Sequence, residues 1–356
     1  MPLKSTNCGA LGKDLSQRGS VSTAHYLTLI IAIGFFAGYP PTLATAQTTP
    51  IALQLVGQTD VSAAGAVMAS KAGFFAREGL TVRIENIAVG GDPKVEDPDA
   101  VVIRLQDARQ LLLDRANGIS SVAFAGNYID SSVALFSRRD RKIRSLDDLS
   151  GKSVGYDAKS DTGLIFEWLL EKNPTFSRSH ISEMPDAPGA KAISDNVLDV
   201  LVGHVGVDDA MLRSMGIASD SLDPRQYGVH ALGTVYVVDE AIIDKKPDML
   251  VGFLRALIAG WDLVYDKPGE ATAAIESMDD GQSRMLPVKA ALRAQREFLR
   301  PGAGRFGEIT ENKWRELQAF MLQRRMLKSP VDLRKATNAN LIAEAYRGYE
   351  NRRSEQ

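Results

Sequence analysis

The side chains best suited to bind a small molecule follow short apolar segments of the kind that form buried strands. Arg104 comes directly after the segment Val101–Ile103, and its guanidinium offers a forked set of donors that fits a carboxylate, sulfonate or phosphate. An internal ion pair with Asp107 is the alternative. Tyr128 follows a second such segment and can either stack on a flat ring or cover a sheet edge. These residue types favour a small organic anion as ligand, with an aromatic heterocycle as the second choice.

The chain lacks the side-chain groupings that catalysis or metal binding would need. Cys8 is its single cysteine, and His180, His204 and His230 do not have the spacing of metal ligands. The letter patterns Gly-x-Ser-x-Gly and Gly-x-Gly-x-x-Gly occur once each, at residues 151–155 and 302–307, but neither directly follows a predicted strand, as a nucleophile turn or a dinucleotide loop would. We therefore expect a binding protein without cofactor or bound metal, and not an enzyme.

Strand, loop and helix alternate along the chain, which is typical of α/β proteins. Strands are predicted at residues 51–56, 81–87, 101–103, 121–125, 197–202 and 234–238. Helices are predicted through residue 68, around 111–113, from about 160 to 173, from 247 onward, and over 287–299, 311–324 and 340–349. This order favours parallel or mixed sheets flanked by helices.

A charged run at residues 137–142 interrupts the apolar rhythm, and a second α/β unit begins after it. In that unit Ser160 or Asp161 can cap a helix whose apolar face includes Leu164 and Trp168. We therefore predict one lobe from residues 47–137 together with 237–356, and another from residues 138–236.

The first 46 residues have the layout of a signal peptide. Three basic residues precede an apolar run, Tyr26–Phe36, and small residues at Ala44 and Ala46 fit the pockets of a signal peptidase. The alternative is a membrane anchor, but the run is shorter than the roughly 20 residues that a spanning helix needs. We expect cleavage between Ala46 and Gln47 and export to the periplasm.

Export would leave a mildly acidic protein. Residues 1–46 contain three basic residues and Asp14, so the remainder has 39 basic against 43 acidic residues and a net charge of −4. That balance argues against nucleic acid as a partner.

Three phrases of the sequence resemble a known family. They are ASKAGFFAREGLTV at residues 69–82, SLDDLSGKSVG at residues 145–155, and KPDMLVGFLRA at residues 246–256 with Gly260-Trp261 after it. The chain is similar in these phrases to the periplasmic sulfonate-, nitrate- and taurine-binding proteins, which share a superfamily with binders of thiamine-pyrimidine precursors. In the first phrase Gly73 would end a helix and Gly79 would turn the chain into a strand.

The resemblance implies a two-lobed periplasmic binding protein, whose lobes are joined by two crossings and close over a small molecule. Its implied partners are the permease and ATPase of an ABC importer, and its implied state is a monomer. Ligand contacts are then expected in loops at the carboxyl ends of strands and at helix N-termini. By position they are, in one lobe, Gln58, Thr59, Asp60, Arg104, Gln106, Asp107, Asn127 and Tyr128, and in the other Lys159, Ser160, Asp161, Thr162, His204, Val205 and Gly206.

Some of these residues have structural alternatives. Asp60 and Ser160 can simply cap helices, and His204 can be a hydrogen-bonded core histidine. The segment VGGDPKVEDPD at residues 89–99 departs from the family pattern, because it is too short and too proline-broken for the helix that usually stands there. The loop that helps to line the cleft is therefore altered.

Two other functions remain open at this level. A periplasmic sensor subunit would bind the same kind of ligand and pass the signal to a membrane partner. A thiamine-pyrimidine-synthase-like enzyme would share the fold, but such fungal enzymes carry an iron-associated cysteine cluster, and this chain has no cysteine after Cys8.

Overall fold

A computed structural model describes residues 48–56, 61–87, 97–186, 189–278, 287–302 and 304–354. The chain divides into two units, residues 1–45 and 46–356, and every described residue lies in the second. The expected signal peptide and its cleavage site therefore lie outside the described residues. In the part of the chain that is described, no helix is both long and apolar enough to cross a bilayer.

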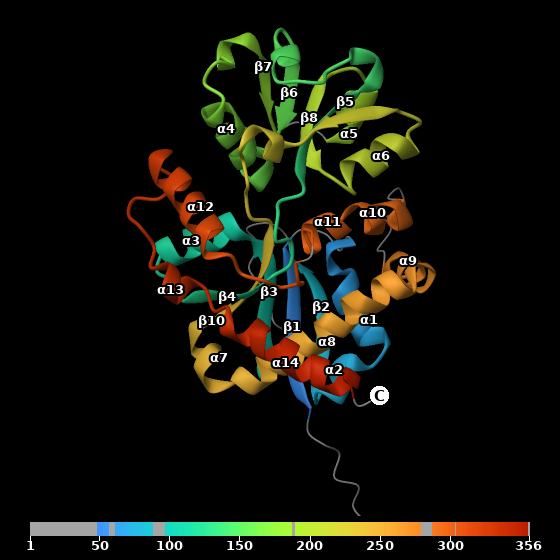
Figure 1. The fold of residues 1–356 in the computed structure, drawn as a ribbon, viewed down its shortest axis with the longest axis vertical. Coiled ribbons are helices and arrows are strands. Elements are labelled where there is room, and N and C mark those ends of the chain that lie inside the picture. Colours follow the sequence, from blue (N-terminus) through green and yellow to red (C-terminus); the bar gives the residue numbers. More distant parts are fainter. Residues whose placement is uncertain are drawn as a thin grey trace, which may run out of the picture. The chain divides into compact units, whose positions relative to one another are not determined.

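Two five-stranded mixed sheets organise the fold (Figure 1). Sheet A has the strand order β2-β1-β3-β10-β4, and sheet B has the order β7-β6-β8-β5-β9. The strands of sheet A are β1 Thr49–Val56, β2 Leu80–Ile87, β3 Val101–Asp107, β4 Ser121–Gly126 and β10 Thr234–Asp239. The strands of sheet B are β5 Val133–Arg138, β6 Ser153–Tyr156, β7 Ser182–Pro185, β8 Val200–His204 and β9 Ser219–Leu222.

One strand in each sheet runs against its neighbours. β10 is antiparallel to β3 and β4, and β5 is antiparallel to β8 and β9, whereas β1 is parallel to β2 and β3. Each of these reversed strands directly follows a crossing from the other sheet. The predicted α/β class with parallel or mixed sheets is confirmed.

The chain passes between the sheets at residues 127–132 and 223–233. We call the part built on sheet A lobe I and the part built on sheet B lobe II. Both crossings precede the boundaries predicted from the sequence, at 137/138 and 236/237. The charged run at 137–142 overlaps the end of β5, which already belongs to sheet B, so this run follows the first crossing and does not mark it.

Helices cover the sheets. In lobe I they are α1 Ala64–Lys71, α2 Phe74–Arg77, α3 Ala108–Ala116, α7 Glu240–Lys245, α8 Pro247–Asp266, α9 Pro268–Glu276, α10 Val288–Ala294, α11 Arg296–Leu299, α13 Leu333–Ala336 and α14 Asn340–Ser354. In lobe II they are α4 Asp161–Lys172, α5 Ala190–Ser194 and α6 Asp208–Ser214. Helix α12, Glu311–Gln323, packs in a core cluster that contains residues of both lobes.

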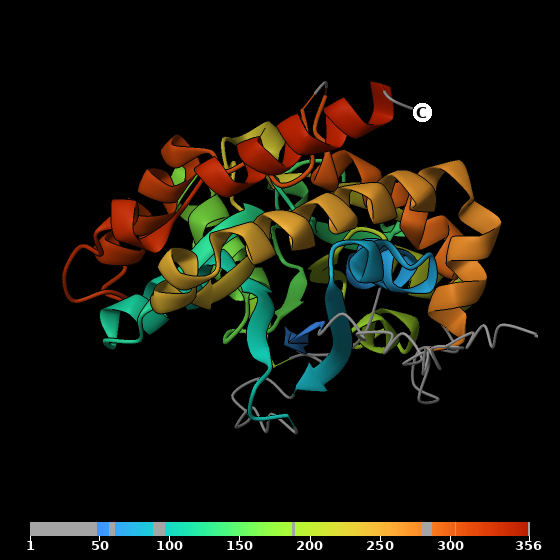
Figure 2. The ribbon, with the colours of Figure 1, turned by 90° about the horizontal axis from the view of Figure 1, so that it is seen from below.

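The long helix α8 organises the core of lobe I. It starts at Pro247, as predicted, and lies between sheet A and α14 (Figure 2). The predicted roles of the two glycines are confirmed: Gly73 and Gly79 have φ values of 70° and 71° on either side of α2. Between them Phe75 stacks on Phe253 of α8 at 5.3 Å, which ties the first phrase of the sequence to the third.

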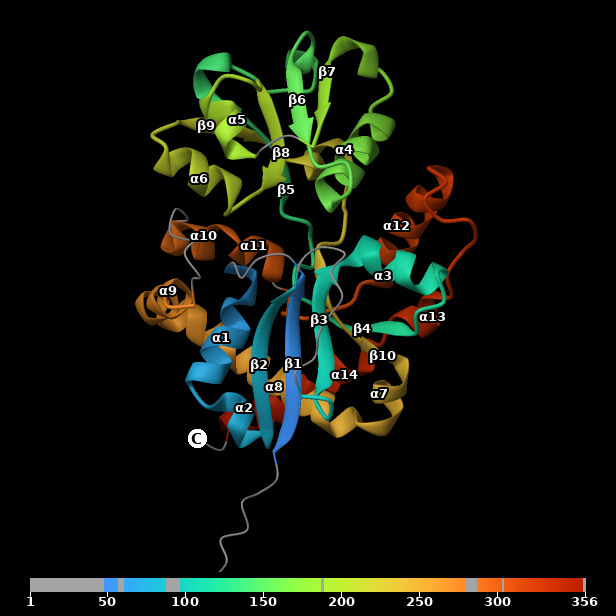
Figure 3. The same cartoon turned by 180° about the vertical axis from the view of Figure 1, so that it is seen from behind.

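The view from the opposite side shows β1, β2 and β3 in front of α8 and α14 (Figure 3). The sequence predicts that a helix is missing between β2 and β3. Of that segment, only Asp97, Pro98 and Asp99 belong to the described residues, and they form a turn. The prediction for residues 89–96 falls outside what the structure describes.

Candidate functional site

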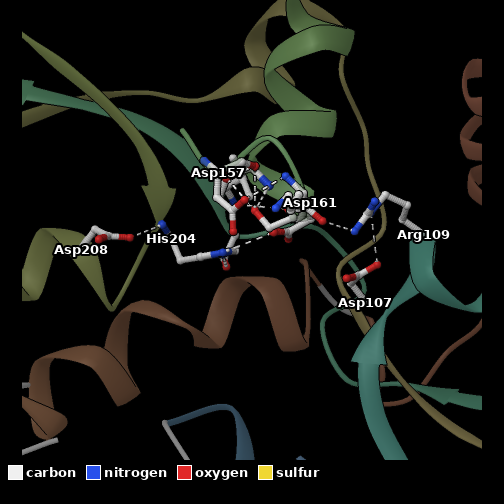
Figure 4. Close-up of polar contacts among 12 residues, drawn as sticks. Asp107, Arg109, Asp157, Asp161, His204 and Asp208 are labelled. Atoms are coloured by element: carbon white, nitrogen blue, oxygen red, sulfur yellow. Dashed lines mark hydrogen bonds and ion pairs between the residues drawn. The ribbon is translucent and has the colours of Figure 1, made fainter. Parts of the chain in front are cut away.

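The N-termini of two helices from different lobes meet at one place, together with the end of β8. Helix α3 of lobe I begins after Asp107, whose side chain caps it by accepting a hydrogen bond from the Gln110 N–H at 2.6 Å. Helix α4 of lobe II begins at Asp161, after the cap residue Ser160. Figure 4 shows Asp161 and His204 on one side and Asp107 with Arg109 on the other. We call these four residues the interlobe cluster.

Arg109 joins the two lobes in this cluster. Its guanidinium donates a hydrogen bond to the carbonyl oxygen of Lys159, and its Nε lies 3.8 Å from the Asp107 carboxylate. Lys159 belongs to lobe II, whereas Arg109 stands in the first turn of α3 in lobe I. One side chain thus spans the gap between the two helix N-termini.

A compact loop presents Asp161. The Lys159 N–H donates to Asp157 Oδ1 at 2.8 Å, and the Ser160 hydroxyl donates to the Asp157 carbonyl at 3.1 Å. Thr162 is buried and its hydroxyl accepts from the Asp157 N–H at 3.2 Å. Ser160 and Thr162 therefore shape the loop and cap the helix, which was the structural alternative for Ser160, and Asp161 faces the cluster.

His204 is the last residue of β8 and is held on three sides. Its Nε2 lies 3.4 Å from Asp161 Oδ1, its Nδ1 lies 3.2 Å from the Ser132 hydroxyl, and its backbone N–H donates to Asp208 Oδ2 at 2.7 Å. The contacts of its two ring nitrogens therefore fix the imidazole in orientation beside the carboxylate of Asp161. Burial raises the pKa of the neighbouring Asp208 carboxyl.

The two carboxyl groups of the cluster have opposite pKa shifts. Burial raises the pKa of Asp107, and the negative charge of Asp161 raises it further, against the opposing effect of Arg109. Burial by itself would raise the pKa of Asp161 too, but the charges of His204 and Arg109 outweigh it, so that this pKa is lowered. Asp161 is thus the charged partner, and Asp107 holds its proton more readily.

Asn127 and Tyr128 have internal partners. Asn127 is fully buried; its amide donates to the Ser62 carbonyl at 3.2 Å and to the Thr234 hydroxyl at 3.3 Å, while its Oδ1 accepts from the Tyr236 hydroxyl at 3.3 Å. The Tyr128 hydroxyl donates to Gln295 Oε1 at 2.6 Å, and its ring packs edge-on against Phe298. Asn127 supports the backbone, whereas Tyr128 is partly exposed.

We expected Arg104 and Gln106 in a loop, but both lie inside β3. Arg104 pairs in register with Gln54 of β1 and with Val237 of β10. Gln106 is buried and donates to Asp114 Oδ2 at 2.9 Å. The sequence was misread because β3 does not end at Ile103; pairing with β10 extends it to Asp107. Gln58, Thr59 and Asp60 lie outside the described residues.

Sequence reasoning missed Arg109. The anticipated pair of Arg104 with Asp107 is replaced by the approach of Arg109 to Asp107. An Asp followed two residues later by Arg at a helix start is a local signal for a capped first turn, and could have identified it. His204 was expected after a strand ending at residue 202, and instead closes β8 itself.

No metal centre accompanies the cluster in the part of the chain that the structure describes. There, no group of three or more histidine, cysteine, aspartate or glutamate side chains could hold a metal ion. The interlobe cluster itself offers hydrogen-bonding and charged groups.

Comparison with known proteins gives a family and a fold. The family model described as NMT1/THI5 like matches residues 60–271. The formylaminopyrimidine-binding protein of Halalkalibacterium halodurans is 22% identical over 265 residues, covering 73% of this chain and 80% of that protein. A putative thiamine biosynthesis protein of Haemophilus influenzae is 24% identical over 323 residues, covering 86% of this chain and 97% of that protein.

Solved structures show the same two-lobed fold. The periplasmic aliphatic sulphonate binding protein SsuA from Escherichia coli matches with a TM-score of 0.62 at 12% identity, over 83% of this chain and 99% of that chain. The desulfurization enzyme DSZB matches with a TM-score of 0.58 at 12% identity, over 85% of this chain and 99% of that chain. The fold therefore serves binding proteins and at least one enzyme.

Proposed function

The chain belongs to the NMT1/THI5 like family, and from this premise we propose that it is the solute-binding component of an ABC importer. In this proposal the protein is exported, loses residues 1–46, and works as a monomer in the periplasm. It captures a small molecule at the interlobe cluster and delivers it to a permease and its ATPase. Structural neighbours that are binding components of import systems support the proposal.

The observation that carries the proposal is the meeting of Asp107 and Asp161 from opposite lobes, beside Arg109, which lies against Asp107 and donates to the Lys159 carbonyl. A ligand that binds both carboxyl groups would hold the lobes together, so that binding and closure become one event. Charged and hydrogen-bonding groups at two helix N-termini are suited to this, because they can exchange water for ligand without unfolding any element.

We propose an amino-bearing aromatic heterocycle as ligand, in preference to the small organic anion favoured by sequence alone. The carboxylate of Asp161 would accept hydrogen bonds from an exocyclic amino group, and the Asp107 carboxyl, on the other side of the interlobe cluster, would pair with a second N–H group of the ligand. The similarity to the formylaminopyrimidine-binding protein of Halalkalibacterium halodurans supports a pyrimidine. The anion rested on Arg104 in a loop, and Arg104 stands within β3.

The other predicted contacts remain part of the proposal. The ring of Tyr128 would cover the flat face of the heterocycle. Lys159 and the His204 ring would border the ligand in lobe II, while Ser160 and Thr162 hold the loop that carries Asp161. Gln58, Thr59 and Asp60 would contribute from the loop after β1.

The test is a thermal-unfolding panel on the purified protein with aminopyrimidines, unsubstituted pyrimidine, sulfonates, nitrate, taurine and carboxylates. A ligand present at about 100 times its dissociation constant adds roughly 2.7 kcal/mol of stability and raises the melting temperature. We expect the rise with aminopyrimidines. A rise with sulfonates or nitrate only would overturn the ligand class, and unchanged melting with every compound would count against solute capture.

Asp161→Asn should weaken aminopyrimidine binding by about 10- to 150-fold, the equivalent of the roughly 1.5–3 kcal/mol of a hydrogen bond to a charged group. Isothermal titration measures it. The matched control is Asp140→Asn, which removes a carboxylate paired with Arg138 on the exposed surface of lobe II. Equal affinities for the two variants would remove Asp161 from the site.

The two alternative functions predict different outcomes after binding. A sensor subunit would show the same binding without uptake, and an enzyme would convert the bound compound.

A further inference from the structure

A pocket of about 500 Å³ lies where the helical segment α10–α11 of lobe I meets the loop after β8 of lobe II. We call it the arginine pocket. Its lining residues are Val205, Arg293, Ala294, Arg296, Glu297 and Arg300. Val205 directly follows His204 of the interlobe cluster, so the pocket starts within one residue of the proposed ligand site.

The spacing of Arg293, Arg296 and Arg300 places these three residues on the same face of the helical segment. Residues 293, 296 and 300 are separated by three and four positions, and the backbone between α10 and α11 stays helical at Gln295, with φ −69° and ψ −16°. Side chains at such spacing lie one above the other along a helix. The pocket therefore has a row of guanidinium groups along one wall.

Two charges of the lining are already neutralised. Arg300 donates to Asp262 Oδ1 at 2.8 Å, and Glu297 accepts from Arg225 at 3.3 Å. Arg296 lies over the ring of Tyr265, with its guanidinium carbon 5.0 Å from the ring centre, a contact that leaves the N–H edges available. Arg293 is exposed, and among the described residues no ion pair involves it. Two positive charges thus remain without a carboxylate.

Next to the pocket, the loop after β8 of lobe II makes a tight backbone contact with α10. Gly206 has φ +90°, and a Cβ atom at this position would lie 3.2 Å from the Ala291 carbonyl oxygen and 3.7 Å from the Ala294 Cβ. The loop after β8 is thus pressed against α10. The wall contributed by Val205 is in place only while this contact holds, so an occupant of the pocket would favour the contact between the lobes.

We propose that the arginine pocket binds an oxyanionic group, that is, a phosphate, sulfonate or carboxylate. Planar guanidinium groups bind such groups through paired N–H donors, and Arg293 and Arg296 supply them without giving up an internal ion pair. The group has two possible sources, a free anion or an acidic substituent on the molecule held at the interlobe cluster. The second source rests on the proposed function, and the first does not.

The first arm of the test uses inorganic phosphate and the purified full chain, with ionic strength held constant by sodium chloride. Isothermal titration should show binding that falls at least 10-fold in Arg293→Ala/Arg296→Ala. The matched control is Arg334→Ala, whose side chain is 94% exposed on α13. All three positions are on the surface, and circular dichroism checks that the variants fold. Phosphate binding that is equal in the double variant and in the wild type overturns a free-anion site.

The second arm compares an aminopyrimidine with the same base carrying a phosphate ester. If the acidic group belongs to the ligand, wild type should bind the ester at least 10-fold more tightly, and the double variant should lose that preference while it still binds the parent base. Binding of phosphate alone, without preference for the ester, assigns the pocket to a free anion. Binding of the parent base with no effect of phosphate or ester overturns the pocket and leaves the proposed function intact. If phosphate binds but neither the parent base nor its ester does, the proposed heterocyclic ligand is overturned and the anion site at the arginine pocket is supported.

Discussion

Helix α4 of lobe II makes two contacts of opposite character, one with α12 and one with lobe I. Phe320 of α12 stacks on Trp168 of α4 at 5.0 Å with an interplanar angle of 12°, and both rings are buried. At the interlobe cluster, the N-terminal end of the same helix α4 is met by Arg109 and Asp107, in polar and partly exposed contacts. One helix of lobe II therefore has an apolar contact at its side and a polar contact at its start.

The difference teaches which contact can open. Separating two stacked rings would return a large apolar area to water, at roughly 25 cal/mol for each Å². The polar groups of the cluster can exchange their partners for water at little net cost. We therefore expect α12 and α4 to stay together while the cluster opens and closes, so that the α12 contact acts as the pivot for ligand entry.

The strongest way to break this comparison is Phe320→Ala. Loss of a buried aromatic ring should cost about 3–5 kcal/mol of unfolding free energy, because it leaves a cavity beside Trp168. Urea unfolding followed by tryptophan fluorescence measures it. Arg315→Ala, an exposed position on the same helix paired with Glu311, is the control and should change stability by less than about 1 kcal/mol. A loss of similar size in the two variants would show that α12 does not secure the lobes.

A second prediction sharpens the comparison at the third contact, between Gly206 and α10. Gly206→Ala and Gly216→Ala both place a side chain at a positive φ, +90° and +76°, and each should cost about 1 kcal/mol of stability. Only Gly206 faces another lobe, since nothing lies within 4 Å of a Cβ at Gly216. Ligand titration should therefore show weaker binding, by several-fold, for Gly206→Ala alone. Equal affinities for the two variants would mean that closure does not use this contact.

The smallest expected effect tests the polar contact itself. Burial and the charge of Asp161 raise the pKa of Asp107 in the folded protein. Above this folded-state pKa, ionised Asp107 therefore lowers the free energy of unfolding. The cost disappears at a pH low enough for the carboxyl to be protonated in both the folded and the unfolded protein. Asp107→Asn keeps a good helix cap and should raise ligand-free stability at pH 7 by less than about 1 kcal/mol. The gain should fade as the pH falls through about 4, near the unfolded pKa. A gain that is independent of pH would point to a cause other than charge.

Local sequence patterns correctly predicted several turns and helix starts of the fold. The phrase containing Gly73 and Gly79 predicts a turn at each glycine, and each has the positive φ that favours this residue. Pro247 predicts the start of α8, because its fixed φ and missing N–H suit the first turn of a helix. Strands β5, β6, β7 and β9 were missed. Three of these are only four residues long, too short for an alternating pattern to stand out.

The candidate site shows where local reading ends. Ser160 as a cap, and Asp161 at the start of a helix, depend on residues within one turn of chain, so the sequence by itself determined them. The position of Arg104 depends on β10, a strand far along the chain whose pairing carries β3 on to Asp107. The bridge from Arg109 to Lys159 joins two lobes and was likewise decided by tertiary structure. Caps and turns follow from neighbouring residues, whereas strand length and contacts between lobes depend on partners that only folding brings together.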